Sequence, residues 1–363
     1  LATFYLFAEA FMRLLGQPSA LVELAGPYIL ALAPGWPFML GVLVLRNFLA
    51  AIDRTRAPLI VIILTTLLNA FFNYLLIFGS WGFPRLELVG AGIASSLAHF
   101  IGFSLLALYV LKEREARRFE LFTRIFQPDW ERLREVARLG WPISVTIGFE
   151  ALLFNACVFV MGRIGVNEVA AYHVALNVAA VAFMIPFGMS MAGATRVGLA
   201  QGAGDIAGVR RSAVASIIVC VAIITAFAIP IALSPQLVAS LYLKTDDPAN
   251  AAVIDFVSAF LPIAAAFMVF DAVQVASGQA LRGLKDVNVP MILTGVSYWV
   301  IGFPLVVWLA LFSPVGAVGV WWGLLTSLVA ASILLGGRLW FLVRPGRDAN
   351  RETGGPPASP EAG

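Results

Sequence analysis

The sequence carries little charge. Only 12% of its 363 residues are Asp, Glu, Lys or Arg, whereas about a quarter of the residues in an average soluble domain are charged. Hydrophobic residues make up 60% of the chain, and its mean hydropathy is +0.90. This composition excludes a water-soluble globule and indicates an integral membrane protein whose main partner is the lipid bilayer.

Residues that bind metals or catalyse reactions are also scarce. The chain has two cysteines and two histidines. Cys157 and Cys220 lie inside apolar runs without metal-ligand spacing, so we interpret them as small buried hydrophobic residues. The HExxH, GxSxG, CxxC and P-loop patterns are absent. We therefore predict no enzyme activity and no cofactor. An intramembrane enzyme is an alternative that a covalent change in any substrate would reveal.

Apolar runs near the roughly 20 residues needed to span a bilayer recur along the whole chain. They predict an all-α integral membrane protein with nine full transmembrane helices. An apolar stub at residues 1–15 precedes them and is too short to span by itself. The predicted spans are 24–50, 57–78, 88–111, 139–162, 167–198, 209–233, 249–280, 287–311 and 316–342.

Lysine and arginine are concentrated in alternate loops, on one side of the predicted membrane. Only Arg13, Arg85, Arg163 and Lys244 lie in the opposite loops, and Arg46 lies within a helix. Because the side richer in positive charge is cytoplasmic, we predict a multi-pass protein of the cell (inner) membrane with a cytoplasmic C-terminus. This sorting also accounts for the net charge of +3 without a nucleic-acid partner.

Two parts of the chain resemble each other. LAAIDRTRAP at 49–58 aligns with LRGLKDVNVP at 281–290, an offset of 232, and VGAGI at 89–93 matches VGAVG at 315–319. Pro34 aligns with Pro262, an offset of 228. Residues 24–111 and 249–342 are therefore predicted to be copies of one three-helix unit in the same orientation, a parallel repeat of the kind found in transporters.

The repeat also implies a missing beginning. The three helices at 139–233 need an earlier copy, of which about 90 residues would precede Leu1. We predict an N-terminally truncated twelve-helix protein that lacks two helices and most of a third. Its predicted parts are an incomplete N-lobe at 1–111, a cytoplasmic linker at 112–138, a C-lobe at 139–343 and a disordered cytoplasmic tail at 344–363. Within the linker, Trp130, Leu133, Val136 and Ala137 fall on one face and predict a short interfacial helix, with a solvated loop as the alternative.

Two carboxylates are predicted to lie at the same depth in the membrane. Glu150 follows the start of its span by 11 residues, about 16 Å, and Asp271 precedes Arg282, at the cytoplasmic end of another helix, by the same number. Asn177 reaches this layer from a third helix. Intramembrane ionisable residues are functional by default, and oxygen ligands suit hard cations. We therefore predict a cation-coupling site, with Na+ at Glu150 and Asp271 or a proton in its place. A protonated structural carboxylate is the alternative.

The first lobe has a weaker polar layer. Asn69 and Asn73 lie one turn apart on one helix face, and Ser95 lies on the next helix. Ion binding and helix-to-helix hydrogen bonding explain this N-lobe polar site equally well. His99 and His173 are candidate proton relays, although a neutral packing histidine explains each of them too.

Five stretches together resemble the multidrug and toxic compound extrusion (MATE) family, nearest its NorM-type branch. They occur in family order on the expected helices. They are APGWP (33–37), LNAFFNYLLIFG (68–79), LGWPISVTIGFEALLF (139–154), AAYHVALNVAAVAFMIPFGMSMAGATRVG (170–198) and DAVQVASGQALRGLKD (271–286).

The resemblance implies a two-lobed helical bundle that works as a cation-coupled antiporter and exports small amphipathic, often cationic compounds. It implies that Glu150 and Asp271 bind the coupling cation with Asn177 as a companion, and that Asn69, Asn73 and Ser95 are partners of an acid on the missing first helix. His173 departs from the usual glutamine. We expect a monomer. A lipid-linked glycan flippase of the same superfamily is the alternative, although such proteins tend to have a basic cavity.

Overall fold

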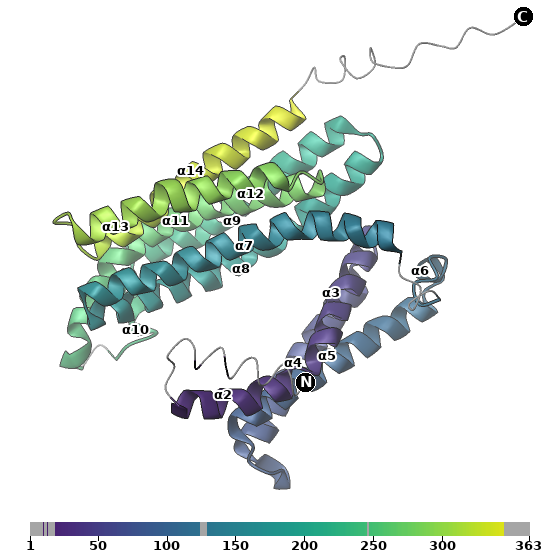
Figure 1. The fold of residues 1–363 in the computed structure, drawn as a ribbon, viewed down its shortest axis with the longest axis horizontal. Coiled ribbons are helices and arrows are strands. Elements are labelled where there is room, and N and C mark those ends of the chain that lie inside the picture. Colours follow the sequence, from purple (N-terminus) through teal and green to yellow (C-terminus); the bar gives the residue numbers. More distant parts are fainter. Residues whose placement is uncertain (1–9, 11–12, 14–18, 124–128, 245–246, 345–363) are drawn as a thin grey trace, which may run out of the picture. The chain divides into compact units, whose positions relative to one another are not determined.

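The structure is a computed structural model that describes residues 10, 13, 19–123, 129–244 and 247–344. The predicted stub at 1–15 and the predicted tail beyond Arg344 fall almost entirely outside these residues. All regular elements in the described part of the chain are helices (Figure 1). Eight of them are long and apolar enough to cross a membrane, or nine when a bent pair is taken as one span. The predicted all-α membrane fold is therefore confirmed.

The helices divide into two compact units, Leu1–Pro128 and Asp129–Gly363. In unit 1, α5 packs against α2, α3 and α4. The predicted single helix at 24–50 is broken: α2 and α3 meet at a bend of 50° beside Pro34, because proline cannot continue the hydrogen-bonding ladder of a helix. The elements of unit 1 are α2 (Ser19–Leu32), α3 (Gly35–Ala51), α4 (Arg56–Phe78), η1 (Ser80–Gly82), α5 (Glu87–Lys112) and α6 (Arg114–Arg117).

In unit 2, α11 is the central helix. It packs against α8, α9 and α14, and its buried apolar residues belong to the main core up to Ala276 and to a second cluster at Ala280 and Leu281. The elements are α7 (Trp130–Ile164), α8 (Val166–Gly202), α9 (Ile206–Leu233), α10 (Pro235–Ser240), η2 (Pro248–Asn250), α11 (Ala251–Gly283), α12 (Asn288–Gly295), η3 (Val296–Gly302), α13 (Phe303–Leu311) and α14 (Val318–Val343).

Residues 130–138 are the first turns of α7. They form neither the separate interfacial helix nor the loop considered from the sequence. The Asp129 carboxylate caps this helix by accepting hydrogen bonds from the backbone N–H groups of Glu131 and Arg132, each at 3.1 Å. Such a cap satisfies amide groups that have no partner inside the helix. The helix can therefore begin well before the apolar part of the sequence.

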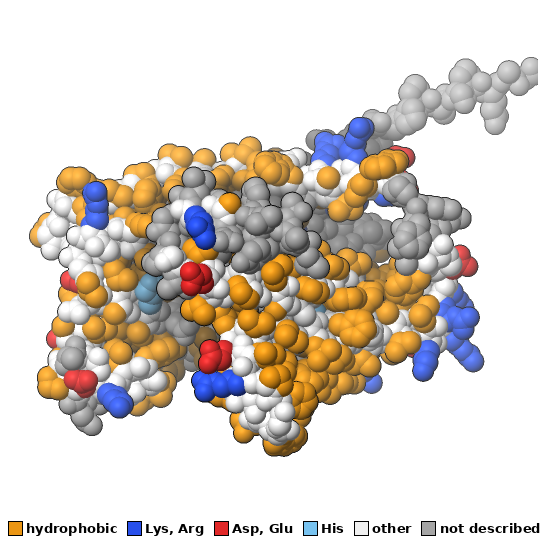
Figure 2. Space-filling model, turned by 60° about the horizontal axis from the view of Figure 1, so that its bottom comes forward, with side chains coloured by type: hydrophobic (Ala, Val, Ile, Leu, Met, Phe, Trp, Pro, Cys, Tyr) orange, Lys and Arg blue, Asp and Glu red, His pale blue; other side chains and the backbone are white. Residues whose placement is uncertain are grey.

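Apolar side chains cover much of the molecular surface (Figure 2). On α4, Leu59, Ile60, Ile63 and Leu67 are all exposed and recur at the spacing of one helix face. A soluble protein rarely exposes so large an apolar stripe. A helix that faces lipid or another membrane helix needs such an apolar stripe on that face.

The two aligned loops have the same backbone geometry. In the first, the backbone N–H of Arg54 donates to Leu49, and Asp53 has φ +59°. In the second, the N–H of Asp286 donates to Leu281, and Lys285 has φ +59°. Corresponding residues of the two loops, such as Asp53 and Lys285, are separated by the offset of 232 found in the sequence. The local repeat is thus present in the backbone, including a left-handed residue that is uncommon outside glycine.

The copies differ at their aligned prolines. Pro34 separates α2 from α3, whereas Pro262 lies inside the continuous helix α11. The two copies agree in one helix contact. In each copy, a glycine of the third helix lies against the helix that precedes it. A Cβ at Gly90 would lie 2.6 Å from the Leu76 carbonyl oxygen, and one at Gly319 would lie 2.7 Å from the Leu309 carbonyl carbon. Small residues allow such close approach between membrane helices.

These contacts predict the effect of adding one methyl group to α14. Gly319→Ala forces the Leu309 backbone away and should destabilise the fold by about 1–3 kcal/mol, the usual cost of overpacking. Gly337→Ala is the matched control on the same helix, because nothing lies within 4 Å of its added Cβ. Thermal unfolding of the detergent-solubilised chain measures both. Equal unfolding temperatures for the two variants would contradict the close packing of α13 and α14.

Candidate functional site

Glu150 lies on α7 beside a cavity of about 410 Å³ within unit 2. The cavity is bounded by α7, α8, α11 and α12, with Leu335 of α14 at its edge. Most of its lining is apolar or aromatic, including Phe154, Phe183 and Phe187. Small-molecule sites in proteins have volumes of about 300–1,000 Å³ and a similar mixture of apolar walls and few polar groups.

Asp271 is the second acid of this region. It lies on α11 with only 7% of its surface exposed. Its carboxyl group interacts electrostatically with that of Glu150. The structure therefore brings together two predicted site residues from different helices. Like charges in an apolar environment repel strongly, so this pair favours the binding of a proton or a metal cation.

A tyrosine missed by the sequence reasoning accompanies the two acids. Tyr298 is 1% exposed and interacts electrostatically with both Glu150 and Asp271. Its hydroxyl oxygen is buried without a hydrogen-bond partner in the part of the chain that the structure describes, as is the hydroxyl oxygen of Thr294, a lining residue of the cavity. An unsatisfied buried hydroxyl costs about 1–3 kcal/mol. Both oxygens are therefore available to a ligand.

Tyr298 lies in an unusual segment of its helix. The predicted span at 287–311 contains the π-helical segment η3, Val296–Gly302, between α12 and α13. Wide turns of this kind are rare and are frequent at functional sites. The sequence offers only weak signs of it, namely Gly295, Gly302 and Pro304 around the segment.

Arg282 adds a positive charge to the same cavity. It lies in the last turn of α11, at the helix end expected from the sequence, lines the cavity and interacts electrostatically with Glu150. The spacing from Asp271 could have indicated this position, because 11 residues correspond to about three full helical turns. Arg282 therefore offsets part of the electrostatic cost of Glu150.

Asn177 does not join the two acids. Its side chain is exposed on α8, and its carbonyl oxygen accepts a hydrogen bond of 2.9 Å from the hydroxyl of Tyr242, which follows α10. It is not among the residues that line the Glu150 cavity. No interaction of Asn177 with either acid is present among the described residues, and its role as a companion ligand stays a prediction. The predicted depth gave no direction for the side chain.

The predicted polar site of unit 1 forms a hydrogen-bonded chain. The amide nitrogen of Asn73 donates to the carbonyl oxygen of Asn69 at 3.0 Å, and the amide nitrogen of Asn69 donates to the hydroxyl oxygen of Ser95 at 3.4 Å. This chain links α4 to α5. The Asn73 carbonyl oxygen is buried without a partner among the described residues, so one acceptor remains for another ligand.

The surroundings of the two histidines give little information on the predicted proton-relay role. His173 is exposed on α8, and its ring contacts that of Tyr172 at 6.0 Å between centroids. His99 is half-buried on α5, and its Nδ1 atom lacks a hydrogen-bond partner within the described residues. Neither residue lines the Glu150 cavity. The proton-relay role remains a prediction.

The site does not resemble a transition-metal centre. Within the described residues, no group of three or more His, Cys, Asp or Glu side chains comes together to hold a metal ion. The oxygen atoms of two carboxyl groups and two hydroxyl groups suit a proton or a hard cation better than a soft metal.

Comparisons with known proteins agree with the fold and identify a family. The family model described as MatE matches residues 1–75 and 142–308. The probable multidrug resistance protein NorM of Rhizobium meliloti (strain 1021) is 41% identical over 342 residues, which cover 93% of this chain and 72% of that protein. The multidrug resistance protein NorM of Burkholderia vietnamiensis is 37% identical over 333 residues, which cover 91% and 71%.

Solved structures share the fold at lower identity. A MATE protein in complex with MaL6 has a TM-score of 0.85 and 20% identity, with 97% of this chain and 76% of that chain covered. A multidrug resistance MATE family transporter in an outward-facing conformation has a TM-score of 0.83 and 21% identity, with 94% and 74% covered. The predicted family and its helical fold are thereby confirmed.

Glu150 and Arg282 line the same cavity and interact electrostatically, which predicts a measurable coupling of their charges. In a double-mutant cycle of Glu150→Gln and Arg282→Gln, the unfolding free energies should be non-additive by about 0.5–3 kcal/mol, the range for interacting residues. A control cycle pairs Glu150→Gln with Arg196→Gln, an exposed arginine of α8 outside the cavity. Unfolding of the solubilised chain gives both values. Additivity in the first cycle would exclude the proposed charge compensation.

Proposed function

Because the chain belongs to the MatE family of multidrug resistance transporters, we propose that it exports amphipathic, often cationic compounds across the cell membrane in exchange for Na+ or H+. Its family makes it a transporter rather than an enzyme. The observation that carries the proposed cation coupling is the pair of acids, Glu150 and Asp271, which interact within membrane helices beside unpartnered hydroxyl groups.

The first step is the binding of the coupling cation. Two adjacent carboxylates in an apolar environment are unfavourable when both are charged, so a proton or Na+ binds there with a gain in electrostatic free energy. Without a metal cation, we expect one proton to be shared by the acid pair. Arg282 balances only one negative charge, and the second remains for the proton or the metal cation.

The hydroxyl groups of Tyr298 and Thr294 extend this site. Hard cations prefer several oxygen ligands, and two carboxyl groups alone supply too few for a closed shell. The buried, unpartnered oxygens of Tyr298 and Thr294 provide further neutral ligands. For a proton, the same hydroxyls donate hydrogen bonds to the carboxylate that remains charged.

The cavity suits a compound that is both apolar and positively charged. Its aromatic residues offer stacking surfaces, and Glu150 supplies a negative charge that Arg282, on the same lining, balances only in the absence of Asp271. A cationic compound and a coupling cation both compete for that charge. If each ligand favours a different conformation of the transporter, their mutual exclusion converts an ion gradient into export.

Asn69, Asn73, Ser95, Asn177, His99 and His173 have secondary roles in this proposal. The Asn73–Asn69–Ser95 chain leaves one acceptor that a ligand from outside unit 1 would satisfy. Asn177 acts through its bond to Tyr242 and not as a ligand of the acid pair. We further propose that the transporter acts as a monomer. Its C-terminus lies in the cytoplasm in this proposal, because lysine and arginine are concentrated in the loops of that side.

Replacing Glu150 tests the coupling directly. Glu150→Gln keeps the shape and hydrogen bonding of the side chain and removes its charge, so the protein should insert and fold normally but lose at least about 90% of gradient-driven efflux, since the charge for which the coupling cation and the exported compound compete is lost. Efflux of a cationic dye from cells or proteoliposomes is measured under an imposed pH gradient and then an Na+ gradient. Glu168→Gln, outside the cavity on α8, is the control.

Two results would contradict this role of the acid pair. One is wild-type efflux in both Glu150→Gln and Asp271→Asn, which would leave Glu150 as a structural carboxylate. The other is transport of a lipid pyrophosphate but not of cationic dyes, which would favour the flippase alternative.

Tyr298→Phe tests the proposed hydroxyl ligand. The variant should need a several-fold higher concentration of the coupling cation for half-maximal efflux and should keep the maximal rate within about two-fold, because one neutral ligand is lost and the acids remain. Tyr172→Phe is the matched control: its buried hydroxyl donates to the backbone oxygen of Phe154 at 3.2 Å, outside the acid pair. Equal cation dependence in the two variants would refute the role of Tyr298.

A further inference from the structure

The Glu150 cavity contains two polar side chains that the proposed cation site does not use. Gln274 and Gln279 lie on α11 and line the cavity. They are only 6% and 7% exposed, and neither side-chain amide has a hydrogen-bond partner among the described residues. Buried polar side chains in proteins are almost always hydrogen-bonded. Two unpaired amides beside one cavity therefore indicate a ligand that satisfies them.

Open space separates the two glutamines. Gly278 lies between them in the sequence and also lines the cavity. Apart from its own helix backbone and its chain neighbours, nothing lies within 4 Å of a Cβ added to Gly278. At 1.5 Å per residue, Gln274 and Gln279 are about 7.5 Å apart along the helix axis. One small molecule can span this distance and contact both amides.

The other walls of the cavity supply contacts for the rest of such a molecule. Glu150 lines it from α7, and the aromatic rings of Phe183 and Phe187 line it from α8. A bound compound therefore meets a negative charge, aromatic surfaces and two amides in one space. A side-chain amide offers both an acceptor and donors and carries no charge, so its natural partner is a neutral group such as a carboxamide.

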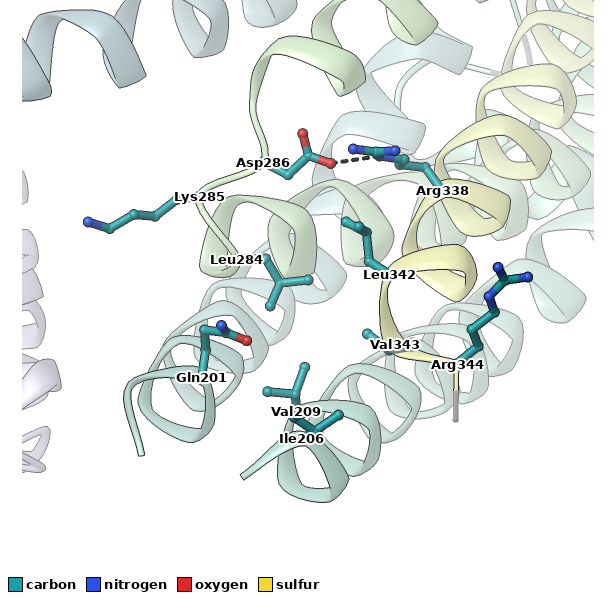
Figure 3. A pocket seen from close by; sticks show the side chains of 10 residues that line it. All are labelled: Gln201, Ile206, Val209, Leu284, Lys285, Asp286, Arg338, Leu342, Val343 and Arg344. Atoms are coloured by element: carbon teal, nitrogen blue, oxygen red, sulfur yellow. Dashed lines mark hydrogen bonds and ion pairs between the residues drawn. The ribbon is translucent and has the colours of Figure 1, made fainter. Parts of the chain in front are cut away.

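A second pocket of unit 2 has no such unpaired groups (Figure 3). It shares no lining residue with the Glu150 cavity. Arg338 donates to the Asp286 carboxylate at 2.8 Å, the pair that Figure 3 marks with a dashed line, and Lys285 pairs with Glu135 at 2.9 Å. Its glutamine, Gln201, is exposed. Buried amides without a partner are therefore a feature of the Glu150 cavity and not of this pocket.

We propose that Gln274 and Gln279 select exported compounds that carry a neutral hydrogen-bonding group in addition to an aromatic ring and a positive charge. This inference rests on the proposed function and extends it from charge to specificity. A site that forms hydrogen bonds with one group of its ligand discriminates against an analogue that lacks the group, because its own polar atoms are then left unpaired.

The test compares two cations of nearly the same shape. They are (para-carbamoylbenzyl)trimethylammonium and (para-isopropylbenzyl)trimethylammonium, which differ only in the carboxamide. Binding of each to the full chain in detergent is measured by isothermal titration calorimetry. The wild type should bind the carboxamide about ten-fold more tightly, and Gln274→Met and Gln279→Met should each reduce this preference by about three-fold, as expected for the loss of one hydrogen bond.

Two further variants control for position. Gln201→Met makes the same change in the second pocket, outside the Glu150 cavity, and should keep the wild-type preference. Gly278→Leu places a side chain in the open space between the glutamines and should weaken the binding of both cations to a similar degree. Thermal unfolding of each variant shows whether the fold is intact.

Four results would overturn the inference: equal affinity of the wild type for the two cations, an unchanged preference in both methionine variants of α11, the same loss of preference in Gln201→Met, or undiminished binding of both cations to Gly278→Leu. Efflux from proteoliposomes separates the inference from the proposed function. Ion-driven export of both cations without preference would contradict the inference alone. Export of neither cation under any ion gradient would contradict the proposed function and, with it, the inference.

Discussion

The cost of a charge or an unpaired polar atom in hydrocarbon governs this structure. A charged side chain at the bilayer centre costs at least about 2.5 kcal/mol, and backbone groups cannot turn to water for hydrogen bonds. This explains why the described chain is helical throughout its regular elements. For the same reason, each polar side chain inside the membrane needs a compensating interaction. Glu150 interacts electrostatically with Arg282, and Tyr298 with both Glu150 and Asp271, so the ionisable exceptions of unit 2 compensate one another in part.

Much of the fold followed from the length and spacing of apolar runs. Seven of the nine predicted spans agree with helices or helix groups to within a few residues, and the other two differ by the early start of α7 and the break at Pro34. Both departures have local causes, a capping aspartate and a proline, whose effects depend on the surroundings. Pro262 makes the point, since an aligned proline leaves α11 continuous. Proline predicts a weak position in a helix, and packing decides whether the helix breaks there.

The candidate site was only partly predictable. Depth along a helix placed Glu150 and Asp271 in one layer, and the structure brings them together. The same reasoning placed Asn177 with them and overlooked Arg282 and Tyr298. Depth is one coordinate of three, and the direction of a side chain depends on helix rotation, which a hydrophobic sequence without a clear polar face leaves open. The π-helical segment around Tyr298 adds a change of rotation that a regular periodicity cannot reveal.

The π-helical segment has a consequence for how the acids and hydroxyls meet. A wide turn holds one more residue than an α-helical turn, so its conversion to α-helix shifts the register of the neighbouring helix by one residue, a rotation of about 100°. Thr294 and Tyr298 lie at the two sides of the start of η3. A register shift would therefore turn one hydroxyl relative to the other around the helix axis. The two hydroxyl oxygens would then face different parts of unit 2 without a break in the helix that carries them.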